Sequence, residues 1–244
     1  MGKRTWKAGD ILVRVLTDDA WTSCYIVKDE ASEQAFVVDP YWINPPLDEL
    51  RTLGVAPPSI TVLVTHPHPD HLDGIYELRE AGYNITAIAH KRIADILNAL
   101  LTEEGIDAVC RQYNVGLFRS EIESMAASME GVEVEAVADG PFCRADLGKG
   151  TTYCFEGHSP ADSVILFPDG HGLAFTGDLV AIMDSDVLFG RTDFPGGNRG
   201  SLTDAIGKTL AILPDNCLVC PGHGEPFELT CSTREMITER LESS

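Results

Sequence analysis

The sequence predicts an α/β sandwich, in which two mixed β-sheets pack face to face and helices cover their outer sides. Three observations predict it. Along the 244 residues, the expected elements are first strands and then strands alternating with helices, followed by a helical stretch. Strands then return, and the chain ends with strands alternating with helices. No Pro-, Gly- or Ser-rich linker interrupts this order, so residues 1–244 are expected to form one domain. A chain of this length can bury a large core without disulfides.

The first half begins with short β-rich runs and ends with the longest helical stretch. Strands are expected at residues 11–16, 24–27, 35–38, 60–65 and 85–89. Helices are expected at residues 47–53 and 72–82. The run Ile60–Thr65 is continuously apolar, as in a strand that is buried on both faces. Residues 91–130 carry apolar side chains at helical spacing, which predicts a helical insert.

The second half returns to strands and ends in a helix. Strands are expected at residues 132–137, 151–155, 163–167, 173–176 and 217–220. Helices are expected at residues 202–213 and 233–241. The short apolar runs between turn residues are typical of buried strands in an α/β protein.

The composition disfavours several classes of protein. The chain has 18 Lys and Arg against 38 Asp and Glu, a net charge of −20, whereas nucleic-acid binding depends on clustered basic residues. Every apolar run is shorter than the ~18 residues of a membrane span. The basic N-terminus lacks the apolar stretch of a secretory signal. We expect a cytoplasmic protein with a small-molecule substrate; the oligomeric state stays open, with a homodimer as one option.

The seven cysteines agree with a reducing compartment, because an odd number does not form a disulfide framework. Cys217 and Cys220 form the only Cys-x-x-Cys pair. They lie on a predicted strand, where side chains three residues apart point to opposite faces. We therefore expect two buried structural thiols and no shared metal.

Five of the seven histidines fall in three short loops, each directly after a predicted strand. The first loop carries a His-x-His-x-Asp-His motif, formed by His66, His68, Asp70 and His71. From the composition, such a motif is expected by chance in roughly one chain in two thousand. The other motifs, also after strands, are Gly157-His158, Thr176-Gly177-Asp178 and Pro221-Gly222-His223-Gly224. The remaining histidines, His90 and His171, match no such pattern and are expected to be structural or solvent-facing.

The spacing within the first loop indicates two neighbouring metal ions. In an extended segment, residues two apart face the same side, so His66 and His68 converge on one ion. The proline after each of them favours this extended geometry. Asp70 and His71 come where the chain turns into a helix, so they face a second ion. The expected ligand sets are His66, His68 and His158 for one ion and Asp70, His71 and His223 for the other, with Asp178 as the bridge.

The donor types indicate which ions these are. Imidazole and carboxylate suit zinc, and they also suit iron or manganese. Two divalent ions about 3.5–4 Å apart can hold a shared water, lower its pKa and polarise a carbonyl or phosphoryl oxygen. The sequence therefore predicts two divalent metal ions, with Zn²⁺ as the first choice.

Together and in this order, the motifs resemble those of the metallo-β-lactamase-fold hydrolase superfamily. The resemblance extends over most of the chain, from the strand at residues 24–27 to Gly224. It implies an αββα sandwich of two mixed sheets flanked by helices, and it implies that the seven residues named above are the metal ligands. The insert at residues 91–130 is longer than the corresponding stretch in compact members of the superfamily.

Residues 190–197, with the sequence Gly-Arg-Thr-Asp-Phe-Pro-Gly-Gly, resemble a segment of glyoxalase II-like hydrolases. A similar Gly-Arg-Thr-Asp-Phe occurs in the related persulfide dioxygenases. Independently of any role in the site, the stretch reads as a Gly-rich turn in which Arg191 pairs with Asp193. The glyoxalase II-like resemblance implies hydrolysis of a thioester, ester or lactone by a metal-bridging hydroxide. Asp70 would then be the catalytic residue that orients the hydroxide or takes part in proton transfer.

Two other functions stay open at the level of the sequence. One is a persulfide dioxygenase with a single iron held by His66, His158 and Asp178. The other is a non-catalytic scaffold that binds metal for stability. Candidate substrate-binding residues are Arg191, Tyr113 and Phe118, although the two aromatic residues also fit a helix core by their spacing.

Overall fold

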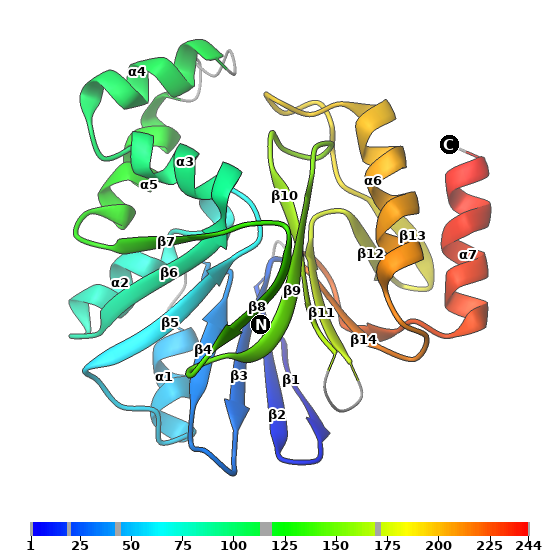
Figure 1. Cartoon of the computed structure of the whole chain (residues 1–244), viewed down its shortest axis with the longest axis horizontal. Helices are drawn as coiled ribbons and strands as arrows, with labels where there is room; N and C mark the ends of the chain where they lie inside the picture. The colour runs from blue at the N-terminus through cyan, green and yellow to red at the C-terminus, as the bar shows by residue number, and fades with distance from the viewer. Residues whose placement is uncertain (1, 19–20, 42–44, 113–118, 169–171, 244) are drawn as a thin grey trace.

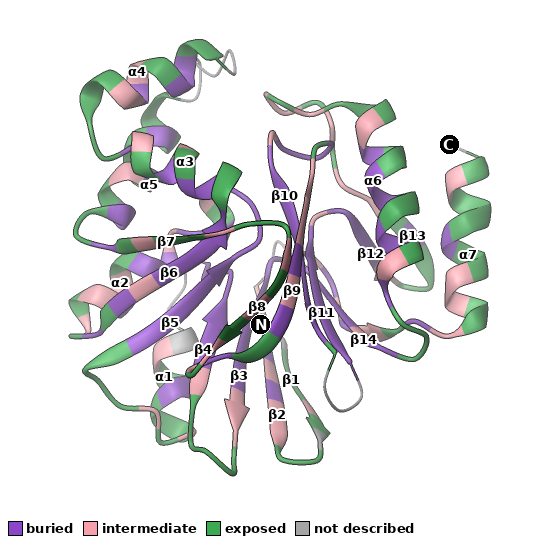
Figure 2. Ribbon diagram, viewed as in Figure 1, coloured by how far each residue is buried: buried purple, intermediate pink, exposed green. Residues whose placement is uncertain are grey.

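Two mixed β-sheets lie face to face between two layers of helices, which confirms the predicted αββα sandwich (Figure 1). The computed structural model describes residues 2–18, 21–41, 45–112, 119–168 and 172–243. Central strands of both sheets are buried, and exposed residues concentrate on the helices and on the ends of strands (Figure 2). The sandwich therefore has its core between the sheets and beneath each helical layer.

The first sheet has seven strands in chain order: β1 (Gly2–Ala8), β2 (Ile11–Thr17), β3 (Ser23–Asp29), β4 (Ala35–Val38), β5 (Ser59–Val64), β6 (Asn84–His90) and β7 (Glu133–Val137). Strands β1 to β4 pair antiparallel, and β4 to β7 pair parallel. Strand β5 is buried on both faces, as its continuous apolar run predicts. Its Val62 and Val64 pack beneath the helices, whereas Leu63 packs between the sheets.

The second sheet has six strands in the order β15 (Phe227–Glu228), β14 (Leu218–Pro221), β11 (Leu173–Gly177), β10 (Asp162–Phe167), β9 (Gly148–Phe155) and β8 (Gly140–Arg144). Strands β11 and β14 are parallel, and the other neighbours are antiparallel. A separate hairpin consists of β12 (Val180–Met183) and β13 (Asp186–Phe189). Strands β1, β8 and the short β15, and both strands of the hairpin, are not among those predicted from the sequence.

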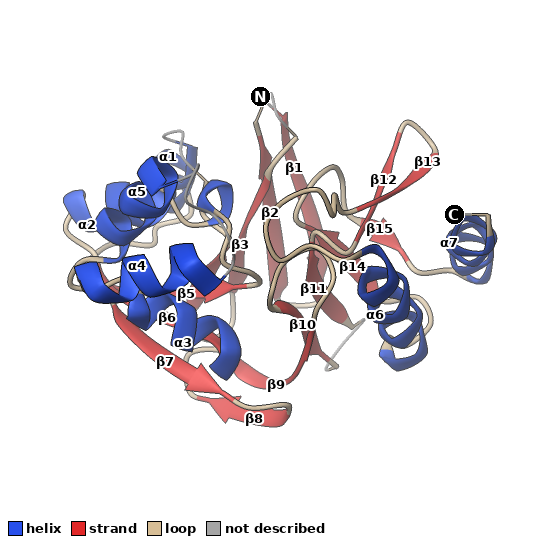
Figure 3. Cartoon of the chain, turned by 90° about the horizontal axis from the view of Figure 1, so that it is seen from above, coloured by secondary structure: helices blue, strands red, loops and turns tan. Residues whose placement is uncertain are grey.

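Helices α1 to α5 cover the first sheet, and α6 and α7 cover the second (Figure 3). The first group comprises α1 (Pro45–Thr52), α2 (Gly74–Glu80), α3 (Lys91–Ala99), α4 (Glu103–Gln112) and α5 (Arg119–Met129). The second group comprises α6 (Arg199–Ile212) and α7 (Cys231–Glu242). The predicted insert at 91–130 thus contains α3, α4 and α5. Among the helices in the described ranges, none has the length and apolar character required to cross a bilayer.

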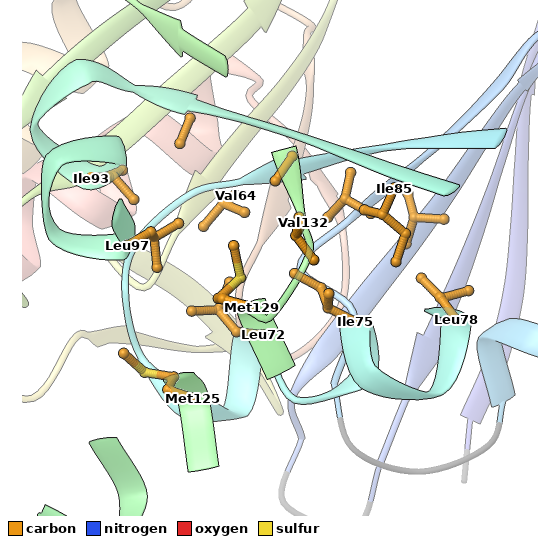
Figure 4. Close-up of a cluster of buried hydrophobic side chains, with 14 of the residues drawn as sticks. Val64, Leu72, Ile75, Leu78, Ile85, Ile93, Leu97, Met125, Met129 and Val132 are labelled. Carbon is orange, nitrogen blue, oxygen red and sulfur yellow. The ribbon is translucent and has the colours of Figure 1, made fainter. Parts of the chain in front are cut away.

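The core consists of three layers of apolar side chains. Between the sheets, aromatic rings meet, with centroids 5.5 Å apart for Phe36 and Phe167 and 5.4 Å apart for Tyr25 and Phe175. Beneath α2, α3 and α5, a second cluster packs on β5 and β6; Figure 4 shows part of it, including Val64, Ile75, Leu97 and Met125. A third cluster joins α6 and α7 to the second sheet.

Cys217 and Cys220 lie on opposite faces of the second sheet, as their spacing predicts. Cys217 packs with the cluster beneath α6 and α7, whereas Cys220 packs between the two sheets. Both thiols are buried, and all seven cysteines of the chain are free. Burial raises the pKa of the Cys217 thiol to about 11, so it is protonated at neutral pH.

Candidate metal centre

The candidate metal centre lies where the carboxyl ends of four strands meet. In the second sheet, β11 and β14 are parallel neighbours, and β9 runs in the same direction because β10 is antiparallel to both β9 and β11. Asp178, His158 and His223 follow these three strands. The His66 loop follows β5 in the first sheet, and the Ser163 N–H donates to the Thr65 carbonyl across the sheets at 2.7 Å. The fold therefore brings both halves of the chain to one point.

The first loop has the local geometry that its prolines favour. His68 is extended, with φ −98° and ψ 146°. The chain then enters a short 3₁₀ turn at Pro69–His71, which redirects the side chains of Asp70 and His71. His66 and His71 are fully buried, His68 is half-buried, and Asp70 is exposed. The turn therefore separates the first two histidines from the other two residues, as the motif spacing predicts.

Six of the seven predicted ligands form two compact groups of donor atoms. In each group, one ligand atom from every member lies within 4.8 Å of the others. The members of the two groups are His66, His68 and His158, and Asp70, His71 and His223. The grouping is the one that the spacing of the motifs predicts for two ions.

The carboxylate of Asp178 lies between these two groups. Its Oδ2 is 3.2 Å from Nε2 of His158, in the first group, and 3.2 Å from Nε2 of His223, in the second. Its Oδ1 is 3.5 Å from Nε2 of His71. Nε2 of His66 is 4.0 Å from Oδ2. The structure thus places Asp178 where a bridging ligand would lie.

Hydrogen bonds behind three of the histidines orient their rings. Nδ1 of His158 lies 2.8 Å from the carbonyl oxygen of Arg191, which can only accept, so Nδ1 carries the proton. Nδ1 of His71 faces a carboxylate oxygen of Asp39 at 3.3 Å. Nδ1 of His66 lies 3.0 Å from Oγ1 of Thr65. With the Nδ1 protons directed outward, the Nε2 lone pairs face the centre, which is the usual orientation of metal-binding histidines.

Asp39 supports two of these histidines and is not among the site residues predicted from the sequence. One carboxylate oxygen accepts from the Thr65 N–H at 2.9 Å, and the other accepts from the Thr65 hydroxyl and faces His71. Because the Thr65 hydroxyl donates to Asp39, it accepts from Nδ1–H of His66. Asp39 also forms a third group of possible metal-binding atoms with His66 and His71, but both of its carboxylate oxygens already accept hydrogen bonds from Thr65. It is therefore a positioning residue. The sequence signal that could have pointed to Asp39 is its position directly after strand β4, which pairs in parallel with β5.

We expect Asp39→Asn to weaken metal binding about 10- to 100-fold, the usual effect of removing a carboxylate behind a histidine ligand. The amide oxygen can still accept from the Thr65 N–H, but the NH₂ group would face the Thr65 hydroxyl and Nδ1–H of His71, which are both donors. His71 would then accept from the NH₂ group through Nδ1 and carry its proton on Nε2, the atom that faces the centre. Asparagine also tolerates the positive φ of 48° at this position. Competition with a chelating dye measures the affinity.

Asp48→Asn provides a control, because Asp48 is an exposed carboxylate on α1 that pairs only with its neighbour Arg51 among the described residues. Its metal affinity should match that of the unmodified protein. Equal affinities in Asp39→Asn and Asp48→Asn would show that Asp39 does not position the ligands.

Burial and neighbouring charges set the protonation of the site. Burial, with the nearby His71, lowers the pKa of His66 well below its usual value. Burial, with the nearby His158, lowers the pKa of His68 to about 3. For His71 and His223 burial acts in the same direction, but the two site carboxylates outweigh it and raise the pKa values to about 9 and about 10. The carboxylates thus attract positive charge, which protons or a metal cation can supply, so metal binding is expected to release protons.

The donor set fits divalent metal ions. Nε2 of His66, Nε2 of His71 and Oδ1 of Asp178 are buried and lack a hydrogen-bond partner among the described residues. Leaving three such atoms unpaired is costly, and all three belong to the candidate site. Imidazole nitrogen and carboxylate oxygen are ligands that zinc, iron and manganese accept.

The segment from Gly190 to Phe194 closes one side of the site. A Cβ on Gly190 would lie 2.1 Å from the carbonyl oxygen of Asp178, so only glycine fits there. The ring of Phe194 contacts His68, with centroids 5.8 Å apart. The predicted pair of Arg191 and Asp193 is present, with two hydrogen bonds of 2.9 and 2.6 Å.

The other predicted residues have different placements. Tyr113, Phe118 and His171 lie outside the described residues. His90 is buried and caps the N-terminus of α3, where its Nδ1 accepts from the backbone N–H of Arg92 at 3.3 Å. His90 is thus structural, as expected for a histidine outside the motifs.

Comparisons with known proteins define the class of this one. The family model described as the beta-lactamase superfamily domain matches residues 34–193. The solved structure of a metallo-beta-lactamase from Pontibacter korlensis aligns over 100% of both chains, with a TM-score of 0.67 and 17% identity. The chain therefore belongs to the beta-lactamase superfamily and is a metal-dependent enzyme with the metallo-β-lactamase fold.

Two curated relatives of the chain carry the names of different activities. The mitochondrial persulfide dioxygenase of Homo sapiens is 24% identical over 227 residues, which cover 91% of this chain and 72% of the relative. A hydroxyacylglutathione hydrolase of Albidiferax ferrireducens is 30% identical over 207 residues, which cover 84% of this chain and 63% of the relative. The comparisons thus place the chain near both a hydrolase and a dioxygenase.

Proposed function

We propose that the protein is a dinuclear metal-dependent hydrolase of a thioester, ester or lactone, with two divalent ions, Zn²⁺ being the first choice. The observation that carries the proposal is the pair of adjacent donor groups with the Asp178 carboxylate between them. His66, His68 and His158 would hold one ion, and Asp70, His71 and His223 the other. When bound, the ions would activate a water molecule as the nucleophile and polarise the carbonyl oxygen of the substrate.

The residues of the chain prepare the site for this reaction. The hydrogen bonds at Nδ1 of His66, His71 and His158 leave the Nε2 lone pairs of these residues directed at the metal centre. Asp70 lines the cavity above the site, and its Oδ2 lies 3.5 Å from Nε2 of His223. Burial alone would raise the pKa of Asp70, but the nearby His71 and His223 hold it below its usual value. Asp70 is therefore ionised, and its carboxylate would accept a hydrogen bond from the attacking water and orient it.

A second candidate is a persulfide dioxygenase with one iron held by His66, His158 and Asp178. The relation to the human persulfide dioxygenase and the Gly-Arg-Thr-Asp-Phe segment beside the site support it. This reaction consumes oxygen, whereas hydrolysis does not.

Metal analysis and a substrate panel test the proposal. We expect two divalent ions per chain and turnover on thioesters, esters or lactones that chelation removes and Zn²⁺ restores. One iron per chain together with oxygen uptake on glutathione persulfide would establish the dioxygenase instead. Metal-loaded protein that acts on neither class of substrate would overturn both enzymatic proposals.

A further inference from the structure

A cavity of about 660 Å³ opens directly above the candidate metal centre. Its floor includes His68, Asp70, His158, Asp178 and His223. This volume lies within the usual range for small-molecule sites, about 300–1,000 Å³. A ligand in the cavity would therefore have one end at the metal centre and the remainder against the cavity walls.

The wall on one side comes from the helical insert. Helix α3 contributes Ile96, α4 contributes Val109, and α5 contributes Glu121, Ile122 and Met125. Four of these five side chains are apolar. Three of them (Val109, Ile122 and Met125) also belong to the core cluster beneath the helices, so this wall is continuous with the core.

Another wall comes from the β12–β13 hairpin. It contributes Val180, Ala181, Met183, Leu188 and Phe189, all of them apolar. Leu188, one of these lining residues, is 43% exposed, a high value for a leucine. Apolar side chains that line a cavity favour an apolar ligand, because the ligand leaves water on binding.

The charges around the cavity disfavour an anionic ligand. Apart from histidines, Arg191 is the one cationic residue among the described residues that line it. Its guanidinium is paired with the Asp193 carboxylate and lies 4.4 Å from the centroid of the Phe194 ring. Glu121 adds a negative charge on the insert side. A glutathione conjugate, which carries two carboxylates, would find no unpaired Lys or Arg among the described residues of these walls.

We infer that the substrate carries an apolar acyl chain, which lies between the insert and the hairpin while its carbonyl group reaches the metal centre. This inference rests on the proposed hydrolase function. In the reaction, the oxygen of a water molecule bonds to the carbonyl carbon and the bond from carbon to sulfur or oxygen breaks. The leaving thiolate or alkoxide takes up a proton, so the products are a carboxylic acid and a thiol or alcohol.

A series of neutral thioesters tests the inference with the metal-loaded protein. We use N-acetylcysteamine thioesters from acetyl to decanoyl, with S-lactoylglutathione as the anionic comparison. The value of kcat/KM should rise about threefold for each added methylene until the cavity is filled, in line with the burial of CH₂ groups. S-lactoylglutathione should be hydrolysed less efficiently than the longer neutral thioesters.

Two Leu→Gln variants, one in the hairpin wall and one outside the cavity, show whether the dependence on chain length arises at the hairpin. Leu188→Gln should lower kcat/KM about tenfold for the decanoyl thioester and much less for the acetyl thioester, because it places a polar group beside the longer chain. Leu101→Gln makes the same change at a leucine of similar exposure, 48%, that does not line the cavity. It should keep the rise with chain length.

Binding of alkanols, which cannot be hydrolysed, to the metal-loaded protein gives a readout that does not depend on catalysis. Calorimetry with neutral 1-alkanols from butanol to decanol should show affinity that rises with chain length and falls in Leu188→Gln. Hydrolysis that does not increase with chain length, or an unchanged Leu188→Gln profile, would overturn the inference while the hydrolase stands. Alkanol binding by a protein that hydrolyses no thioester, ester or lactone would overturn the hydrolase and leave the apolar site.

Discussion

Asp178→Ala is expected to release metal from both donor groups and to lower thioester turnover about 10³-fold, which corresponds to roughly 4 kcal/mol of transition-state stabilisation. The reason is its position, since its carboxylate lies 3.2 Å from a histidine nitrogen of each group. The site would keep five imidazoles but lose the anion that draws the two cations together. Elemental analysis and initial rates at saturating metal measure the two effects.

Asp204→Ala serves as the control, because Asp204 is an exposed carboxylate on α6 that lies outside the site. It should retain the metal content and the turnover of the unmodified protein. Circular dichroism establishes that both variants are folded. An Asp178→Ala protein that holds two ions and turns over normally would show that this carboxylate does not bridge the ions.

Gly222→Ala is expected to reduce turnover about 100-fold or more by displacing ligands, without removing any of them. An added Cβ would lie 2.1 Å from Oδ1 of Asp178 and 2.8 Å from Cε1 of His71. The backbone of Gly222 cannot easily move away. Its N–H donates to the Gly177 carbonyl, and its carbonyl accepts from the Ser23 N–H, both at 2.8 Å. Rates and metal content, measured side by side, show whether the displaced carboxylate still binds.

Gly207→Ala is the matched control for this substitution. Gly207 lies within α6, and a Cβ there would have no atom within 4 Å. It should leave the activity unchanged and raise the free energy of unfolding by about 0.5–1 kcal/mol, since alanine favours the helix. Normal activity in Gly222→Ala would mean that the close approach of Gly222 to Asp178 does not exist in solution.

Features that depend on neighbouring residues could be predicted from the sequence. The grouping of His66 and His68 follows from an extended segment with prolines, and the buried strand β5 follows from its apolar run. The pairing of Arg191 with Asp193 also follows from a short spacing. In each case, the local backbone geometry determines where the side chains lie.

Features that depend on distant pairing could not be predicted in this way. The role of Asp39 requires the parallel register of β4 with β5, which places it beside Thr65. The β12–β13 hairpin turns at Asp184 and Ser185, with φ values of 50° and 72°. Such a turn usually contains Asn-Gly or Asp-Gly, so this one gives a weak signal. The hairpin wall of the cavity was missed for the same reason, whereas the wall from the helical insert lies in the predicted stretch 91–130.

The cavity walls and the candidate metal ligands come from separate parts of the chain. The candidate ligands follow strands of the sandwich, whereas both walls come from segments placed between its strands, namely the insert and the hairpin. Natural selection can therefore exchange residues such as Leu188 or Ile96 and retune which molecule is accepted while the reactive machinery is inherited intact. Proteins that share this arrangement can therefore change their substrate preference through changes in single loops.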